Sequence, residues 1–530
     1  MTPPPLEGNG SAAAGAKRGG RGPKLPEIEP RKAIGGGVKW ADQRLGVAKG
    51  GRTFLDKIFP DHWSFLLGEI ALYSFIILIL TGIFLSLYYE PSSAQVVYEG
   101  IYKPLRGQSM SAAYASSVNL SFAVRSGLVI RQMHHWAADV FVGSIAVHMA
   151  RVFFTGAYRR PRELNWIVGV TLLTLAIVNG FLGYSLPDDL VSGTGLRIAF
   201  SIILSVPLVG TYLAWFVFGG NFPGDGSIIP RLFILHVLVI PLIIFGLLAA
   251  HLGLLVKQKH TQFPGPGRTE KNVVGSPMYP NFILKTTGFM FMVAGVLWAL
   301  GGLVQINPIW QFGPYQPDKI SYAVQPDWYM GWLDGALRIM PSWEFAGFGH
   351  TIPFEVFLPA VLFPGLTFGL FYAWPFVEAW LTGDHAEHQL LDRPRDRPKR
   401  TAIGAAFLTF YFCLFAASST DVMANFFKIS LNIVLWSFRF IVMIVPIIVG
   451  FVTWRICLDM AGVPGIGKRK RAVVVVRTAT GQYATVESAP RPGDGHVENE
   501  PITVPGEIDI PAVKDEGLDP VPAGVRRAER

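Results

Sequence analysis

The chain has 530 residues, of which 51% are hydrophobic and 16% charged, and its mean hydropathy is +0.37. This composition excludes an ordinary soluble enzyme and indicates an all-α polytopic membrane protein. The net charge is +9, but the sequence has no Walker or G-x-G-x-x-G motif, so we expect neither nucleotide chemistry nor a nucleic-acid partner.

Polar tails flank the apolar part of the chain. Residues 1–57 carry 11 Lys or Arg against five Asp or Glu and are predicted to form a basic, mostly disordered cytoplasmic tail. Residues 461–530 are predicted to form a second cytoplasmic tail, with weak β character near 472–476. Between them we predict an N-terminal domain (58–260), containing a four-helix bundle, and a C-terminal domain (261–460), also with four helices. The eight predicted transmembrane helices are about 64–89, 129–154, 166–187, 230–257, 284–305, 353–379, 402–418 and 431–457.

Basic residues are concentrated in the even-numbered connections between these spans. Residues 151–162 carry four arginines and residues 393–400 carry five Lys or Arg, whereas the odd-numbered connection 419–430 carries one. Positively charged loops stay on the cytoplasmic side of a membrane. The sequence therefore predicts that the even-numbered connections and both termini face the cytoplasm.

Two of the apolar segments each carry two histidines at similar spacing. His134 and His148 are 14 residues apart, and His236 and His251 are 15 apart. In a regular helix, 14 residues advance by about 21 Å and return to within about 40° of the same face, and 15 residues to within about 60°. Each helix would thus present one histidine near each side of a hydrocarbon core about 30 Å thick. Two such helices facing each other predict two bis-histidine sites stacked across the membrane, which suits two haems; His135 points away from His134 and is interpreted as non-ligating.

Cysteines limit what kind of cofactor the chain can hold. Only Cys413 and Cys457 occur, both within predicted spans, and there is no Cys-x-x-Cys-His motif. A covalently attached c-type haem and an iron–sulfur cluster on this chain are therefore excluded. Any iron–sulfur centre that works with it would lie on another subunit.

Glycines repeat at the histidine spacing in two other spans. Gly68 and Gly82 in the first span, and Gly169 and Gly183 in the third, are each 14 residues apart. A porphyrin edge needs a close approach of the backbone, which glycine allows. Packing between membrane helices through small residues is the alternative. Because the spacing matches that of the histidines, we assign these glycines to the haem sites.

Three arginines are candidates for binding haem propionates. Arg131 lies three residues before His134, and Arg151 lies three residues after His148, towards the opposite membrane face. Arg231 is a further candidate on the outer side. A positive-inside anchor is the alternative for Arg151, but it does not account for the two arginines on the outer side.

These residues resemble those of cytochrome b, the membrane core of respiratory quinol–cytochrome c reductases. The resemblance covers about residues 55–460 and includes the histidine and glycine pairs and the sequence Gly183-Tyr184-Ser185-Leu186-Pro187. Pro326-Asp327-Trp328-Tyr329 is similar to the quinol-site Pro-Glu-Trp-Tyr of the family, with Asp in place of Glu. The sequence is most similar overall to actinobacterial cytochrome b subunits. Relatives that attach an extra haem do so through a cysteine near the start of the first span, and residues 55–68 contain none.

The resemblance implies two non-covalent haems b and a division of electrons between two routes. The outer haem would be bound by His134 and His236, and the inner one by His148 and His251. Quinol would be oxidised at the outer face, with one electron passing to a Rieske partner. The other would pass through both haems to a quinone on the cytoplasmic side, contributing to a proton gradient.

At the outer site a base must accept a proton from the quinol. Asp327 is the candidate, with Tyr329 beside it, and it is one methylene shorter than the family's Glu. Tyr184, Pro187 and a turn at 193–195 are expected to shape the same pocket.

The cytoplasmic quinone site is less clear from the sequence. Where relatives carry an Asp after the Lys that opens the fifth span, this chain has Lys285-Thr286, so the proton donor must differ. Glu69, next to Gly68, is one candidate, and Lys257 and His260 are others. Glu69 could instead extend towards lipid head groups.

The resemblance also implies partners and a location. We expect a bacterial cell membrane, menaquinol as the substrate, Rieske and c-type cytochrome subunits, a homodimer, and association with a terminal oxidase. Two alternatives remain. A di-haem anchor of another quinone-linked oxidoreductase would have fewer spans and no Pro-Asp-Trp-Tyr loop, and a proton-coupled transporter with buried histidines would show no visible absorption.

Overall fold

The computed structural model describes Trp40 and residues 42–44, 54–319, 325–347, 349–461, 472–477 and 483–488. The described residues up to Ala461 form one compact unit, and the strands that follow belong to a second. The predicted tails therefore lie largely outside the described residues. Within the second tail, β7 (Ala472–Arg477) pairs antiparallel with β8 (Tyr483–Ser488), which agrees with the β character expected near 472–476.

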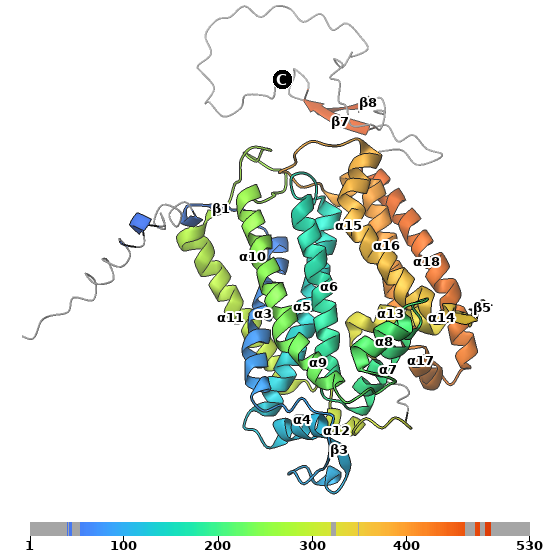
Figure 1. The fold of residues 1–530 in the computed structure, drawn as a ribbon. Helices are drawn as coiled ribbons and strands as arrows, with labels where there is room; N and C mark the ends of the chain where they lie inside the picture. The colour runs from blue at the N-terminus through green and yellow to red at the C-terminus, as the bar shows by residue number, and fades with distance from the viewer. Residues whose placement is uncertain are drawn as a thin grey trace, which may run out of the picture. The chain divides into compact units, whose positions relative to one another are not determined.

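Eight apolar helices among the described residues are long enough to cross a membrane, which confirms the predicted all-α polytopic class (Figure 1). Their limits differ from the predicted ones by at most six residues. Five spans consist of one helix, preceded in the first case by the 3-10 turn η1 (Trp63–Phe65): α3 (Leu66–Ser86), α5 (Gly127–Thr155), α6 (Glu163–Ser185), α16 (Pro398–Ala417) and α18 (Leu431–Met460). Three consist of joined segments: α9 (Ile228–Ile234), η3 (Leu235–Val239) and α10 (Ile240–Gln258); η4 (Met278–Phe282) and α11 (Ile283–Leu303); and α14 (Phe354–Phe357), η6 (Leu358–Leu362) and α15 (Phe363–Thr382).

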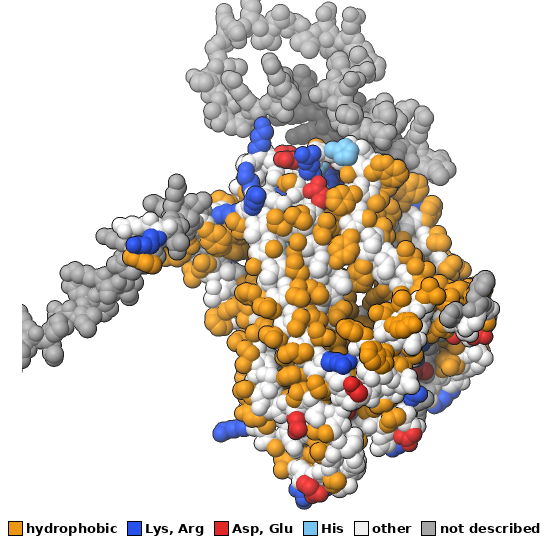
Figure 2. All heavy atoms as spheres, viewed as in Figure 1, with side chains coloured by type: hydrophobic (Ala, Val, Ile, Leu, Met, Phe, Trp, Pro, Cys, Tyr) orange, Lys and Arg blue, Asp and Glu red, His pale blue; other side chains and the backbone are white. Residues whose placement is uncertain are grey.

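The first four spans pack as two helix pairs. α3 lies along α5, and α10 lies along α6, with α11 against the outside of α3 and α5. Their largest core cluster joins Phe75 of α3, Phe141 of α5, Val170 of α6 and Ile244 of α10. In the other half, α16 runs along α18, and α15 packs on α6. The side chains exposed at mid-height are mainly hydrophobic and the charged ones gather towards the ends, as expected for helices in a bilayer (Figure 2).

Short helices that the sequence pattern does not predict fill the odd-numbered connections. They are α4 (Ala112–Phe122), α7 (Leu190–Leu204), α8 (Gly210–Phe218), α12 (Ile309–Phe312), α13 (Gly331–Ile339) and α17 (Thr420–Phe427). The 3-10 turns η2 (Lys103–Leu105) and η5 (Trp328–Met330) and two hairpins, β2 (Gln95–Val97) with β3 (Ser109–Ser111) and β5 (Glu344–Gly347) with β6 (His350–Pro353), complete these connections. On the other side lie η7 (Pro394–Asp396) and the pair β1 (Ile58–Phe59) with β4 (Ser276–Pro277).

The predicted turn at 193–195 is wrong, because these residues lie inside α7. Buried Asp189 starts that helix, since its Oδ1 accepts hydrogen bonds from the backbone N–H of Val191 (2.9 Å) and Ser192 (3.2 Å). A Cβ at Gly193 would run into the ring of Tyr315. The glycine therefore serves close packing of a helix rather than a turn.

Buried ion pairs join the two halves of the chain on the even-numbered side. Arg400, only 5% exposed, donates to Glu378 of α15 (2.6 Å) and to Asp392 (2.7 Å). Arg159, between α5 and α6, also pairs with Asp392 (3.1 Å). Breaking one partner of a buried pair leaves an uncompensated charge, so these arginines hold the connections together in addition to carrying positive charge.

Candidate functional site

The four predicted histidines lie in the core of the four-helix unit. His134 and His148 are on α5, His236 is in η3, and His251 is on α10. The rings of His134 and His236 lie edge-on to each other, with centroids 6.2 Å apart and planes at 75°. Two imidazoles whose nitrogens each lie about 2 Å from one metal ion bring their ring centroids roughly 6 Å apart. The pair therefore has the separation that one shared metal ion requires.

A π-turn absorbs the extra residue between His236 and His251. η3 (Leu235–Val239) is a π-helical turn that contains His236 itself. Such a turn accommodates one residue more than an α-helical turn and is often found at functional sites. The 15-residue step therefore covers the same helical turns as the 14-residue step on α5, and the offset of about 60° expected for a regular helix is reduced.

Each of the four glycines faces one of the four histidines. A Cβ built on Gly82 would lie 3.3 Å from the His134 ring, and one on Gly68 would lie 3.4 Å from the His148 ring. On the other helix pair, a Cβ on Gly169 would lie 3.7 Å from the His251 ring, and one on Gly183 would overlap the ring of His236. The repeat of these glycines predicts a place at a porphyrin edge, and in the described structure their nearest side-chain neighbours are the imidazoles.

In His134 and His236, hydrogen bonds at Nδ1 leave the lone pair of Nε2 available to bind a metal ion. Thr81 Oγ1 donates to the carbonyl of Ile77 (2.7 Å), so it accepts from Nδ1–H of His134 (2.8 Å). Nδ1–H of His236 donates to the carbonyl of Asn179 (2.9 Å). Fixing the proton on one ring nitrogen makes the other a ligand, which is the usual arrangement around metal-bound histidine.

The second pair lines a cavity of about 600 Å³, within the size range of cofactor sites. Nδ1 of His148 and Nδ1 of His251 are buried and make no hydrogen bond to any described residue. The polar or small residues around the same cavity include Gly68, Glu69, Tyr73, Arg151, Gly169, His260 and Thr286. Two imidazoles in a mostly apolar cavity are the donor set of a low-spin haem, so the residues present fit that group.

Of the three predicted arginines, Arg151 lines a histidine site and Arg131 is partly buried on α5, three residues before His134. Arg131 donates to the carbonyl of Asn307 (3.0 Å), while its buried Nε makes no hydrogen bond to any described residue. Arg151 lines the 600 Å³ cavity and donates to the carbonyl of Ser64 (3.3 Å). Guanidinium groups with unused donors fit an anionic partner. Arg231 is exposed instead, and it donates to two carbonyl groups at the end of α8.

Asp327 is held between two other residues at the start of η5. Its Oδ1 lies 3.0 Å from Nε2 of His135, and its Oδ2 accepts from the hydroxyl of Tyr329 (3.0 Å). Burial, followed by the charge of Asp327, raises the pKa of Tyr329 well above its usual range, so the phenol stays a donor. Tyr184 lies at the end of α6, and a Cβ on Gly195 would touch its ring at 3.9 Å.

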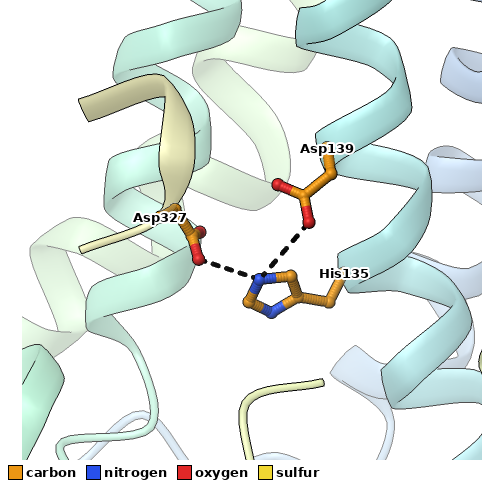
Figure 3. A group of neighbouring side chains, drawn as sticks. All are labelled: His135, Asp139 and Asp327. Carbon is orange, nitrogen blue, oxygen red and sulfur yellow. Dashed lines mark hydrogen bonds and ion pairs between the residues drawn. The ribbon is translucent and has the colours of Figure 1, made fainter. Parts of the chain in front are cut away.

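Sequence reasoning missed the α5 residues that surround this loop. His135, Asp139 and Gly143 follow each other at four-residue intervals on α5. Nε2 of His135 also lies 4.0 Å from Asp139 Oδ2 (Figure 3). A Cβ on Gly143 would lie 3.3 Å from the Trp328 ring, and one on Gly180 of α6 would lie 2.7 Å from the Tyr329 hydroxyl. The four-residue spacing is a signal in the sequence, but it does not identify the partner 192 residues away.

At the opposite end of the bundle, Glu69 is the centre of a small hydrogen-bonded group. Thr286 of α11 donates to Glu69 Oε2 (2.7 Å), and Tyr73 donates to the same oxygen (3.2 Å). The hydroxyl groups of Tyr73 and Thr286 also contact each other. The threonine at the position where the resemblance predicts an Asp is thus bonded directly to another carboxylate.

The two other candidates for a cytoplasmic proton donor, His260 and Lys257, differ from Glu69 in their charge or exposure. Burial, together with the charges of Lys57, Arg162 and Arg151, lowers the pKa of His260 to about 4, so this imidazole is neutral near pH 7. Lys257 is exposed. Glu69 is therefore the candidate that both faces the cavity and belongs to a hydrogen-bonded group.

The chain is similar to known proteins over most of its length. Residues 139–314 match the family model described as cytochrome b(N-terminal)/b6/petB. Proteins named cytochrome bc1 complex cytochrome b subunit are similar to it: the one from Streptomyces coelicolor is 52% identical over 421 residues, covering 79% of this chain and 77% of the relative. The one from Mycobacterium leprae is 49% identical over 474 residues, covering 88% and 84%. A solved chain described as hyperthermophilic respiratory Complex III has a TM-score of 0.57 at 23% identity and covers 79% of this chain and all of its own length.

Proposed function

Because the chain belongs to the cytochrome b family of bc1 complexes, we propose that it oxidises quinol at its outer face and conducts electrons through two haems b to a quinone near its cytoplasmic face. It is a multi-pass membrane protein and a haem-binding component of a quinol–cytochrome c reductase. The number of haems, the two quinone sites and the route of the electrons are the parts that we propose.

The haem sites follow from the paired imidazoles. His134 and His236 would hold the outer haem, and His148 and His251 the inner one. A bound haem b supplies a one-electron carrier at each level of the membrane. Arg131 and Arg151 would bind propionate groups, while the exposed position of Arg231 gives no support for its predicted role. The observation that carries this proposal is that each histidine is matched by a glycine whose Cβ would lie within 4 Å of the imidazole.

At the outer site Asp327 would accept a proton from the quinol. Tyr329 and His135 hold its two oxygens, and each carboxylate oxygen keeps a further lone pair for the incoming proton. Tyr184 would help to enclose the quinol from the end of α6. At the cytoplasmic site Glu69 would supply a proton to the quinone, with Tyr73 and Thr286 fixing its carboxylate.

The proposal also covers the partner subunits of the chain, its substrate and its orientation in the membrane. As a subunit of a bc complex it works with partner subunits, and we propose a Rieske iron–sulfur subunit and a c-type cytochrome on the outer side, where the short helices lie. Menaquinol as the substrate, a homodimer, association with a terminal oxidase and a cytoplasmic location of both termini are also proposed.

A reduced-minus-oxidised spectrum of the purified complex, with haem quantified per chain, tests this function directly. We expect two non-covalent haems b per chain. His148→Ala should remove the inner haem and leave the outer one, whereas His135→Leu should leave both. Two haems in His148→Ala and in His251→Ala would contradict the ligand assignment, and a spectrum without visible haem bands would favour a proton-coupled transporter.

A further inference from the structure

α5 presents two functional faces that point in different directions. One carries His134 and His148, which face the glycines of α3. The other carries His135 and Asp139, which point towards the loop that brings Asp327 (Figure 3). Gly143 lies on the same face, against the ring of Trp328. Successive residues of a helix are rotated by about 100°, so adjacent His134 and His135 necessarily belong to different faces.

The second face brings two carboxylates against one imidazole. Asp139 and Asp327 both approach Nε2 of His135, at 4.0 and 3.0 Å, and one oxygen of each carboxylate and this nitrogen lie within 4.8 Å of one another. The side chains of His135, Asp139 and Asp327 are 13%, 11% and 16% exposed. Asp139 Oδ1 is buried and has no hydrogen bond to any described residue.

Two carboxylates this close, with so little access to water, disfavour simultaneous ionisation. Protons are then gained and lost by the pair rather than by either residue alone. A single Nε2–H can donate a full hydrogen bond to only one of the two carboxylates. The other carboxylate therefore keeps lone pairs that can accept a proton.

We propose that the base of the outer quinol site is a carboxylate pair, in which Asp327 shares the accepted proton with Asp139 and His135 is the positioning residue that holds the two together. This inference deepens the proposed function and rests on it. In the step, a quinol O–H bond breaks as an O–H bond forms on Asp327, and exchange of that proton with the Asp139 carboxylate leaves the charge of the pair unchanged. No electron moves in this exchange.

The pair compensates for the short side chain at position 327. An Asp reaches one methylene less far than the Glu expected from the resemblance, and here a His and a second carboxylate extend from α5 to meet it. Among the described residues, the groups that act electrostatically on Asp139 are His135 and Asp327, with the Trp328 side chain as a hydrogen-bond donor. The other charged or titratable groups around the cluster are Arg131 of α5, Tyr329 of η5 and Tyr184 of α6.

Quinol oxidation by the purified complex tests this pair, with a reduced naphthoquinol as the donor and a c-type cytochrome as the acceptor. We expect Asp139→Asn to lower kcat about tenfold or more while KM changes little, because in this proposal the quinol contacts Asp327 and not Asp139. The shape of the pH–rate profile should also change, because the site then holds one carboxylate instead of two. Asp225→Asn, at an exposed outer position, is the matched control and should behave as wild type.

A double-mutant cycle separates a shared base from two independent residues. The double variant Asp139→Asn/Asp327→Asn should be no slower than Asp327→Asn alone, because residues that act as a unit are not additive. His135→Gln keeps an N–H donor and should retain more activity than His135→Leu. Asp139→Glu keeps a carboxylate and should retain most of the rate if Asp139→Asn fails to assemble with its haems.

The outcomes distinguish this inference from the proposed function. A wild-type rate and pH profile in Asp139→Asn, additive losses in the double variant, or an Asp139→Glu variant as slow as Asp139→Asn would overturn the carboxylate pair and leave Asp327 as a single base. A wild-type rate in Asp327→Asn would overturn the proposed base itself, and the pair with it.

Discussion

Single residues of the helix bundle differ in how closely they approach the imidazoles, and the four glycines give a graded series. A Cβ at Gly183 would overlap the His236 ring, whereas one at Gly169 would lie 3.7 Å from the His251 ring, at ordinary contact distance. We therefore expect Gly183→Ala to displace His236 and reduce the outer haem, while Gly169→Ala keeps the inner haem. Haem content per chain, resolved by redox titration into two components, measures both effects.

The pair of variants controls for the loss of a glycine as such. Both substitutions add the same methyl group to the same helix, and both favour the helical conformation over glycine. Equal haem content in the two variants would mean that the imidazole contacts do not decide the role of these glycines, and packing between helices would then be the better explanation.

Glu69 allows a rescue experiment at the cytoplasmic site. Glu69→Gln keeps the hydrogen bonds from Tyr73 and Thr286 possible but removes the proton, so we expect quinone reduction at this site to slow by roughly 10²–10⁴-fold, the contribution of general acid–base catalysis. The first turnover of quinol oxidation at the outer site should be unaffected. Stopped-flow spectra of the haems separate the two reactions.

Thr286 supplies the control for that experiment. Thr286→Val removes one donor to Glu69 and should have a small effect. Thr286→Asp on the Glu69→Gln background places a carboxylate where the resemblance predicts one, and it should recover part of the rate. A Glu69→Gln enzyme with wild-type re-oxidation of the inner haem would show that the proton enters by another route.

At the scale of elements, the π-turn in the fourth span predicts how the haem sites respond when one residue is deleted or inserted between two histidines of the same helix. η3 holds one residue more than an α-helical turn, so deletion of Leu238 should allow a regular helix that keeps His236 and His251 at a 14-residue spacing, like that of α5. We expect this variant to assemble with both haems. Insertion of one alanine after Phe141 of α5, which has no such turn, should cost one haem.

The two length variants test the turn from opposite directions. If the π-turn absorbs the extra residue, haem content should survive deletion in the fourth span and fall on insertion in α5. Loss of both haems in the deletion variant would mean that the widened turn itself is needed to orient His236, for example through its hydrogen bond to Asn179.

The elements also show which features a sequence can predict. The eight spans and the matched histidine and glycine repeats depend on local hydrophobicity and helical spacing, so they could be predicted within a few residues. The short outer helices could not, because their apolar runs are brief and their packing depends on distant partners, as with Gly193 against Tyr315. The contact between His135 and Asp327 joins residues 192 positions apart, and no local pattern encodes it.

At the scale of the whole molecule, the orientation in the membrane can be tested by thiol labelling. The native thiols, Cys413 and Cys457, are buried, so they give little background. We expect a membrane-impermeant maleimide to label Lys103→Cys in intact cells and to label Lys271→Cys only after the membrane is opened; both positions are exposed. The reverse pattern would invert the predicted topology and place Asp327 on the cytoplasmic side.

Because the haem ligand and the residue beside the quinol base share the backbone of α5, mutations elsewhere cannot separate them. His134, the proposed iron ligand, and His135, the proposed holder of the quinol base, are joined by one peptide bond, and their Cα atoms are about 3.8 Å apart whatever the surrounding loops do. Mutations in the outer connections could move the far end of the pocket, but they could not change this spacing. Covalent geometry thus fixes the backbone separation between the proposed ligand of the haem that accepts an electron and the residue that holds the proton acceptor.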